Sequence, residues 1–184
     1  GLSSACEGRY KRRNSRAAPP PAKEHPSDMR AFILCVILVL AAAPALADME
    51  GQPAVIDGDS LSIAGVVFNL HGIDAPESDQ TCDKDGERYP CGFQAANVLG
   101  YMTAYQWVQC RDNGTGRDGR YTMTCFLGGR YDVGEKMIRQ GWALYDRAYR
   151  IPAYQAAEDA ARAERAGLWA GDFVAPWDWR QGKR

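Results

Sequence analysis

Two short segments of the sequence place carboxylates where strands are expected to end. Asp59 lies in VIDGDS, and Asp74 and Glu77 lie in GIDAPES, where Pro76 stiffens the turn that carries Glu77. A barrel of strands could bring Asp59 and Asp74 to one rim. Two carboxylates and a backbone carbonyl suit a hard cation that prefers oxygen ligands. The pattern therefore indicates a cation site with a further carboxylate beside it, although each aspartate alone also suits an ordinary turn.

Short strands and helices must position these residues. β-Branched and aromatic runs predict five strands, at residues 54–56, 61–63, 66–73, 107–110 and 121–127. Helical spacing and a capping box predict three helices, at residues 93–102, 133–140 and 152–166. Residues 79–90 are charged and turn-forming and are expected to be a loop. The pattern predicts an α+β fold compatible with a five-stranded OB-fold β-barrel carrying three helices.

The first 47 residues are expected to lie outside the folded domain. Residues 1–28 are basic and Pro-rich and lack apolar periodicity, so we expect them to be disordered or to precede a true start at Met29. Residues 29–47 read MRAFILCVILVLAAAPALA, with the charged, apolar and A-x-A parts of a secretory signal peptide. Cleavage near Ala47 would release residues 48–184 as one secreted or periplasmic domain without stable membrane association. An uncleaved anchor is the alternative.

Four cysteines remain in the mature chain. An even number of cysteines in an exported protein indicates disulfides. Cys110 and Cys125 flank the turn-rich RDNGTGRDGR and could face each other on a hairpin, and Cys82 and Cys91 close a short loop. We therefore predict the pairs Cys82–Cys91 and Cys110–Cys125. A zinc site made by four thiolates is the alternative, although no C-x-x-C spacing is present.

The mature chain is acidic. Residues 48–184 contain 15 Lys and Arg against 20 Asp and Glu, a formal net charge of −5. A protein that depends on bulk attraction to nucleic acid is normally basic. Any phosphate recognition must therefore be local, and binding to nucleic acid is expected to be weak and salt-sensitive.

Three segments occur in an order and spacing that are specific together: VIDGDS, FNLHGIDAPES and GRDGR. With GEKMIRQGWA and the stretch from Tyr154 to Trp169, they resemble the thermonuclease (staphylococcal-nuclease-like) family over residues 54–169. The cysteine pattern and the PWDWR tail are similar to an exported bacterial branch of that family. The resemblance implies an OB-fold and a calcium-dependent phosphodiesterase that hydrolyses DNA or RNA. The two tail tryptophans, Trp177 and Trp179, are expected to pack back onto the domain rather than to stack on bases.

The resemblance also assigns roles to individual positions. Asp59, Asp74 and the backbone carbonyl of Ala75 match the Ca²⁺ ligands of the family. Glu77 matches the carboxylate that activates or positions the attacking water. Arg120 matches an arginine that faces the phosphoryl oxygens.

The second family arginine is replaced by Asn69, while Arg117 could add a phosphate contact. A neutral amide does not bring the charge and the bidentate fork of a guanidinium to a phosphate. Losing one preorganised donor typically costs ~3–4 kcal/mol of transition-state stabilisation, or about 10²–10³ in rate. His71 is expected on the strand face of Asn69 and could contact a phosphate when protonated. The alternative for His71 is a half-exposed strand residue without such a role.

Two functions fit these observations. The first is an exported, calcium-dependent and monomeric nuclease that is slow or altered because of Asn69. The second is a catalytically impaired module that binds nucleic acid or metal on the same fold. A purely structural domain would not need the set Asp59, Asp74, Glu77 and Arg120. We favour the nuclease because the metal and general-base positions are all present.

Overall fold

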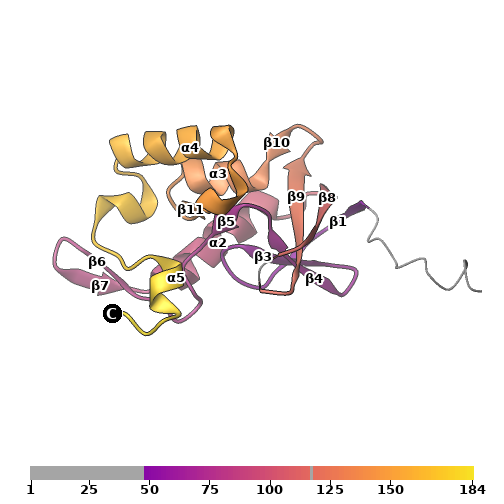
Figure 1. The fold of residues 1–184 in the computed structure, drawn as a ribbon. Helices are drawn as coiled ribbons and strands as arrows, with labels where there is room; N and C mark the ends of the chain where they lie inside the picture. The colour runs from indigo at the N-terminus through magenta and orange to yellow at the C-terminus, as the bar shows by residue number, and fades with distance from the viewer. Residues whose placement is uncertain (1–47, 117) are drawn as a thin grey trace, which may run out of the picture. The chain divides into compact units, whose positions relative to one another are not determined.

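A mixed β-sheet organises the computed structural model, which describes residues 48–116 and 118–184 (Figure 1). The predicted signal peptide and N-terminal extension (residues 1–47) and Arg117 lie outside the described residues. The sheet has seven strands in the order β1-β8-β9-β4-β3-β2, with β10 paired to β9. These strands are β1 (Met49–Gly51), β2 (Ala54–Val55), β3 (Ser60–Ile63), β4 (Val66–Leu70), β8 (Val108–Thr115), β9 (Tyr121–Leu127) and β10 (Tyr131–Asp132).

The α+β class is confirmed, but the five-stranded closed barrel is not what the structure contains. All five predicted strands are present, and β1 and β10 add to them. Strands β1 and β2 end the sheet order on opposite sides, and within the described residues they do not pair with each other. Neighbouring strands are antiparallel except β4 and β9, which run parallel. The hydrogen-bonded sheet is therefore open and is not a closed barrel.

Two small ladders lie outside this sheet. Strand β5 (Ile73–Asp74) pairs with β11 (Leu144–Tyr145), so that Asp74 lies opposite Leu144. Strands β6 (Cys82–Lys84) and β7 (Glu87–Tyr89) form a hairpin in the segment predicted as a loop. That prediction is wrong because Asp85 and Gly86 both adopt positive φ, at 53° and 82°, which is the backbone of a tight hairpin turn.

The three predicted helices are confirmed as α2 (Cys91–Thr103), α3 (Val133–Arg139) and α4 (Pro152–Ala163). The Asp132 side chain caps α3 by accepting from the Glu135 amide at 3.2 Å. A short helix α5 (Pro176–Trp179) and the 3₁₀ helices η1 (Arg147–Tyr149) and η2 (Gly167–Ala170) complete the fold. Of the helices in the described part of the chain, none has the length and apolarity needed to span a bilayer.

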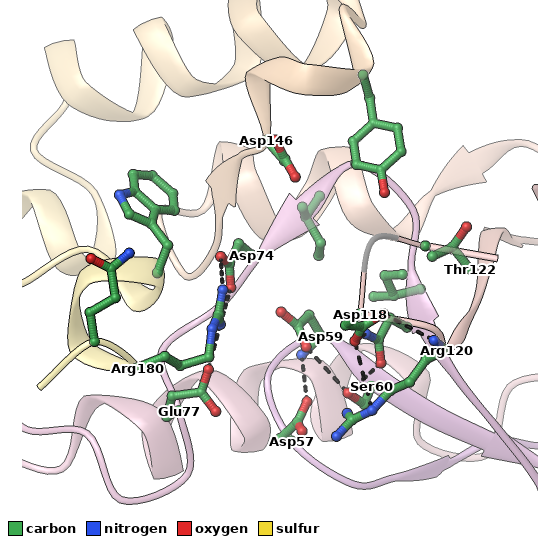
Figure 2. Close-up of a pocket in the computed structure, with 18 residues that line it drawn as sticks. Asp57, Asp59, Ser60, Asp74, Glu77, Asp118, Arg120, Thr122, Asp146 and Arg180 are labelled. Atoms are coloured by element: carbon green, nitrogen blue, oxygen red, sulfur yellow. Dashed lines mark hydrogen bonds and ion pairs between the residues drawn. The ribbon is translucent and has the colours of Figure 1, made fainter.

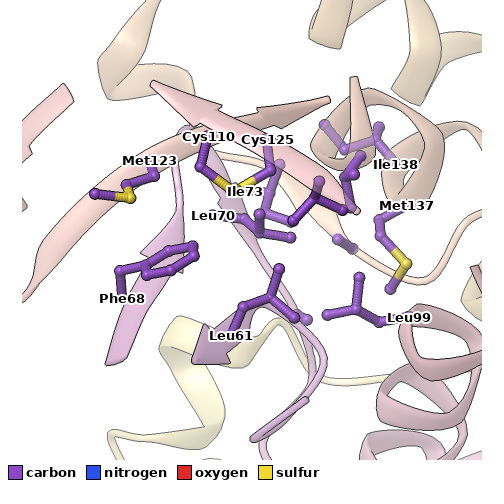
Figure 3. Packing of buried hydrophobic residues seen from close by; sticks show 14 of the residues in the cluster. Leu61, Phe68, Leu70, Ile73, Leu99, Cys110, Met123, Cys125, Met137 and Ile138 are labelled. Carbon is purple, nitrogen blue, oxygen red and sulfur yellow. A yellow bond between two sulfur atoms is a disulfide. The ribbon is translucent and has the colours of Figure 1, made fainter. Parts of the chain in front are cut away.

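The main core lies between the sheet and helices α2 and α3 (Figure 3). Strand β4 shows how alternation builds it: Phe68 and Leu70 are buried, whereas Val67, which precedes Phe68, is exposed. Leu99 from α2 and Met137 from α3 are fully buried in the same cluster.

Both predicted disulfides are present. Cys110 and Cys125 face each other across β8 and β9 inside the main core. Cys82–Cys91 joins β6 to the start of α2 and packs in a second cluster with Leu168. Because their sulfurs are paired, these cysteines do not form the alternative zinc site.

Truncating the buried residue of β4 should destabilise the domain far more than truncating its exposed neighbour. We expect Phe68→Ala to lower the free energy of unfolding by about 3–5 kcal/mol, since it removes a fully buried ring and leaves a cavity. The matched Val67→Ala change should cost about 0.5 kcal/mol or less. Denaturant titration under oxidising conditions measures both, and equal losses would contradict this description of the core.

Candidate active site

A pocket of about 640 Å³ lies where the ends of β3, β4 and β5 meet the C-terminal tail. Figure 2 shows side chains from these distant parts of the chain turned toward the same space. The pocket brings together five residues predicted from the sequence: Asp59, Asn69, Asp74, Glu77 and Arg120.

Asp59 is held against the end of β5 by a close backbone approach. The Ala75 amide donates to Asp59 Oδ2 at 2.7 Å. Gly58 permits this approach, because a Cβ at that position would lie 2.7 Å from the Ala75 Cβ and 2.9 Å from the Ala95 Cβ of α2. On the other side, the Leu70 amide donates to the Asp59 carbonyl at 2.7 Å. Glycine is thus required next to the first predicted metal ligand.

The carboxylates in the pocket repel one another. Burial raises the pKa of Asp59 well above its usual value, and the charges of Asp57 and Asp74 add to the rise. The amide of Ala75 acts in the opposite direction by stabilising the ionised form. Like charges held this close favour the binding of a cation.

A calcium ion would be held by Asp59, Asp74 and the Ala75 carbonyl. These are hard oxygen donors of the kind that Ca²⁺ binds, and the Ala75–Asp59 hydrogen bond keeps the two segments together. Within residues 48–116 and 118–184, no three His, Cys, Asp or Glu side chains are clustered as a metal site. The two carboxylates and the carbonyl are of the right chemical kind, but they are few, so waters or substrate would be needed to complete the coordination of such an ion.

Glu77 lies on a loop that is fixed by one buried glutamine. Gln80 is fully buried. Its side-chain Oε1 accepts from the Glu77 backbone amide at 3.2 Å, and its backbone amide donates to the Glu77 carbonyl at 2.8 Å. Gly92, at the start of α2, packs on this loop so closely that a Cβ there would lie 1.7 Å from the Glu77 carbonyl oxygen. The position of Glu77 is thus set by α2 and Gln80.

Arg120 and Asn69 meet at Asp118, which the sequence analysis did not consider. The Asn69 Nδ2 donates to Asp118 Oδ2 at 2.9 Å, and Arg120 Nε lies 3.7 Å from the same oxygen. The Asn69 Oδ1 in turn accepts from the Ser60 hydroxyl at 3.1 Å. Asn69 therefore orients the turn that carries Arg120.

His71 does not line the pocket with the other candidates. Its Nδ1 lies 3.2 Å from the Thr122 hydroxyl, and its ring packs edge-on against Tyr149, with the centroids 4.3 Å apart. Burial lowers the pKa of His71, which favours the neutral imidazole. The geometry gives no support to a charged phosphate contact by His71. Arg117, the other expected phosphate contact, lies outside the described residues.

Arg180, which follows α5, also lines the pocket and was not predicted from the sequence. Its Nη1 and Nη2 donate to Asp74 Oδ1 at 2.9 Å and Oδ2 at 2.7 Å, and Nη1 also donates to Glu77 Oε1 at 2.5 Å (Figure 2). These bonds, first of all those to Asp74, raise the pKa of Arg180. The segment PWDWR (residues 176–180) contains this arginine, but only its two tryptophans had been assigned a role, in packing.

The fold and this site match one protein family. The model of staphylococcal nuclease homologues matches residues 67–171. The succinoglycan biosynthesis protein ExoI of Rhizobium meliloti (strain 1021) is 34% identical over 158 residues, covering 84% of this chain and 83% of that protein. An uncharacterized 38.1 kDa protein of Capnoides sempervirens is 32% identical over 119 residues, which are 64% of this chain and 32% of that protein.

The pocket is that of a nuclease-type OB-fold domain. The chain belongs to the staphylococcal nuclease family, whose members generally hydrolyse phosphodiester bonds, bind nucleic acids and depend on calcium. The matched region contains Asp74, Glu77 and Arg120, whereas Asp59 and Arg180 lie outside it.

Replacing Asp59 by an amide should stabilise the metal-free domain near neutral pH. Because the folded-state pKa of Asp59 is raised, ionising it costs stability as the pH rises from its unfolded value of about 3.8 through its folded value. In chelator at pH 7, we expect Asp59→Asn to raise the free energy of unfolding. The gain should vanish in acid.

The exposed Asp85, in the β6–β7 turn, gives the control. Asp85→Asn should leave the pH profile of stability unchanged. Denaturant titrations across the pH range measure both variants. If Asp59→Asn were neutral or destabilising at pH 7, the repulsion inferred for this pocket would be wrong.

Proposed function

We propose that this protein is an exported, calcium-dependent phosphodiesterase that hydrolyses DNA or RNA. The observation that supports this most is the single pocket shared by Asp59, Asp74, Glu77 and Arg120. These residues come from distant segments of the chain, and a merely structural domain would not need to gather them. Membership of the staphylococcal nuclease family supports the same chemistry.

Each side chain has a role in this proposal. Bound calcium would supply positive charge against the phosphoryl oxygens. Glu77 takes a proton from the attacking water; its Oε2 accepts no hydrogen bond from another described residue, while its Oε1 is held by Arg180. Arg120 donates to the non-bridging oxygens as negative charge builds in the transition state, and its side chain is exposed to the pocket.

The cellular setting is also part of the proposal. Two disulfides suit an oxidising compartment, in agreement with the predicted signal peptide at residues 29–47. We propose that cleavage near Ala47 releases residues 48–184 as a monomer in the periplasm or outside the cell. The net charge of −5 should make its binding to nucleic acid weak and strongly dependent on salt.

A binding module without useful hydrolysis is the second candidate. Asn69 favours it, because the amide is occupied with Asp118 and brings no charge to a phosphate. One relative is named as a succinoglycan biosynthesis protein, which gives a reason to consider substrates other than nucleic acid as well. A generic phosphodiester such as bis(p-nitrophenyl) phosphate should therefore be assayed together with DNA and RNA.

Removing the proposed general base should abolish cleavage. We expect Glu77→Gln to reduce calcium-dependent hydrolysis of single-stranded DNA or RNA by about 10²–10⁴-fold, the usual contribution of a positioned base. Purified protein from Asp48 onward is assayed with calcium and with a chelator. Glu87→Gln, on the exposed strand β7, is the matched control and should remain fully active.

Full activity of Glu77→Gln would overturn the assignment of the base. Binding of the oligonucleotide without cleavage by the unmodified protein would favour the module, and Asn69→Arg should then restore hydrolysis. Cleavage of bis(p-nitrophenyl) phosphate alone would identify a phosphodiester substrate other than nucleic acid.

Calcium should stabilise the folded protein through the proposed ligands. A ligand that binds only the native state stabilises it by about 2.7 kcal/mol at a hundredfold excess over its Kd. We expect a calcium-dependent rise of Tm in the wild-type protein and none in Asp59→Asn. Differential scanning calorimetry with and without chelator measures the difference, and an equal rise in both proteins would place the ion elsewhere.

A further inference from the structure

The C-terminal tail is attached to the loop that carries Glu77. Gln80, which fixes that loop, donates from Nε2 to the Val174 carbonyl at 2.7 Å. Asp83 and Asp172 exchange two backbone hydrogen bonds, at 2.9 and 2.8 Å. Next to them, the Cys82–Cys91 disulfide ties the β6–β7 hairpin to α2. The tail therefore has a defined position beside the pocket.

This attachment places Arg180 on the rim opposite Arg120. Trp179 donates from its indole nitrogen to Asp79 Oδ1 at 3.4 Å, on the same loop as Glu77. Trp177 lines the pocket as well. Figure 2 shows the Arg180 side chain entering from the tail between Asp74 and Glu77.

The guanidinium of Arg180 keeps one edge free. It has five N–H groups. Three of them donate to Asp74 and Glu77: both of Nη1 and one of Nη2. The N–H of Nε and the second N–H of Nη2 remain, and no described residue accepts from Nε. These two lie on the same side of the planar group and form the parallel fork that matches two oxygens of a phosphate.

Positive charge is scarce in the pocket. Among the described residues that line it, carboxylates outnumber the two arginines, Arg120 and Arg180. Both arginines are already paired with carboxylates, Arg120 with Asp118 at 3.7 Å and Arg180 with Asp74 at 2.7 Å. A phosphodiester that enters this acidic pocket therefore needs the charge of both guanidinium groups, which stay protonated.

We propose that Arg180 is the second phosphate-binding guanidinium of this site. From the tail it supplies the positive charge and the paired N–H donors that the Asn69 amide on β4 does not supply. Its Nε and Nη2 edge donates to the non-bridging oxygens, while its other edge keeps Asp74 and Glu77 in place. This inference rests on the proposed function, because it assigns a contact to the substrate of that reaction. It also extends the site beyond residues 67–171, which the family model matches.

Three tail variants test the proposal. Arg180→Gln should lower kcat/KM for a single-stranded oligonucleotide by about 10²–10³-fold, as expected for one lost transition-state donor. Arg180→Lys keeps the charge without the fork and should recover only part of that loss. Lys183→Gln is the control, since it removes a positive charge from the same tail but does not line the pocket. Thermal melting of each variant checks the fold.

Binding in chelator gives a readout that does not require hydrolysis. The affinity for a fluorescein-labelled single-stranded oligonucleotide is measured by anisotropy over a range of salt concentrations. Each lost phosphate contact lowers the slope of log K against log salt by about 0.7 for single strands. Arg180→Gln should show this reduction, and Lys183→Gln should not.

The double variant Asn69→Arg with Arg180→Gln separates a phosphate contact from a structural role. A guanidinium restored at position 69 should rescue much of the lost hydrolysis, although the tail contacts of Arg180 stay absent. No rescue, with the fold intact, would overturn the proposal.

The remaining outcomes separate this inference from the proposed function. Cleavage by the wild-type protein that Arg180→Gln leaves unchanged overturns the role of Arg180 alone. Faster cleavage by Arg180→Gln, with tighter calcium binding by calorimetry, would show instead that Arg180 blocks the cation site. A wild-type protein that binds the oligonucleotide through Arg180 but never cleaves it retains the contact and refutes the nuclease. If the wild-type protein neither binds nor cleaves the oligonucleotide, both proposals are wrong.

Discussion

The hydrogen bond from the Ala75 amide to the Asp59 carboxylate joins two segments that are 16 residues apart, and the site depends on it. It is possible because Gly58 has no side chain where Ala75 and Ala95 approach. It keeps Asp59 near Asp74, whose charge adds to the rise of the Asp59 pKa that burial and the charge of Asp57 cause in the first place. The buried core of strands and helices offsets this repulsion. A destabilised cluster of oxygen donors held by a rigid scaffold is typical of a functional site, where stability is exchanged for function.

The pocket has two structural sources. One is the OB-type domain of the staphylococcal nuclease family, which supplies Asp74, Glu77 and Arg120. The other is the tail after residue 171, which is fixed by Gln80 and contributes Arg180. The β6–β7 hairpin of the domain, which the Cys82–Cys91 disulfide joins to α2, connects the two parts through the backbone hydrogen bonds between Asp83 and Asp172. A substitution in the tail, such as one at Arg180, can therefore change the charge and hydrogen bonding in the pocket while the residues of the domain stay the same.

Local patterns in the sequence predicted much of this structure. The Asp132 cap, the facing pair Cys110–Cys125 and the helices all depend on short-range spacing. The β6–β7 hairpin was missed although an Asp-Gly turn signalled it, because its flanking strands are charged and not apolar. Sheet closure was mispredicted, since alternation along a strand does not determine which edges pair. Arg180 could not be found by spacing, because it lies 106 residues from Asp74 in the chain.

We propose that the acidic end of this pocket holds a cation between the β2–β3 turn and β5. Anomalous X-ray scattering from crystals of residues 48–184 grown with calcium tests it most directly, because it locates the ion without reference to activity. We expect one strong peak within coordination distance of the Asp59 and Asp74 carboxylates and the Ala75 carbonyl, with ligand distances of about 2.3–2.6 Å. A calcium-saturated crystal with no peak at those oxygens would contradict it.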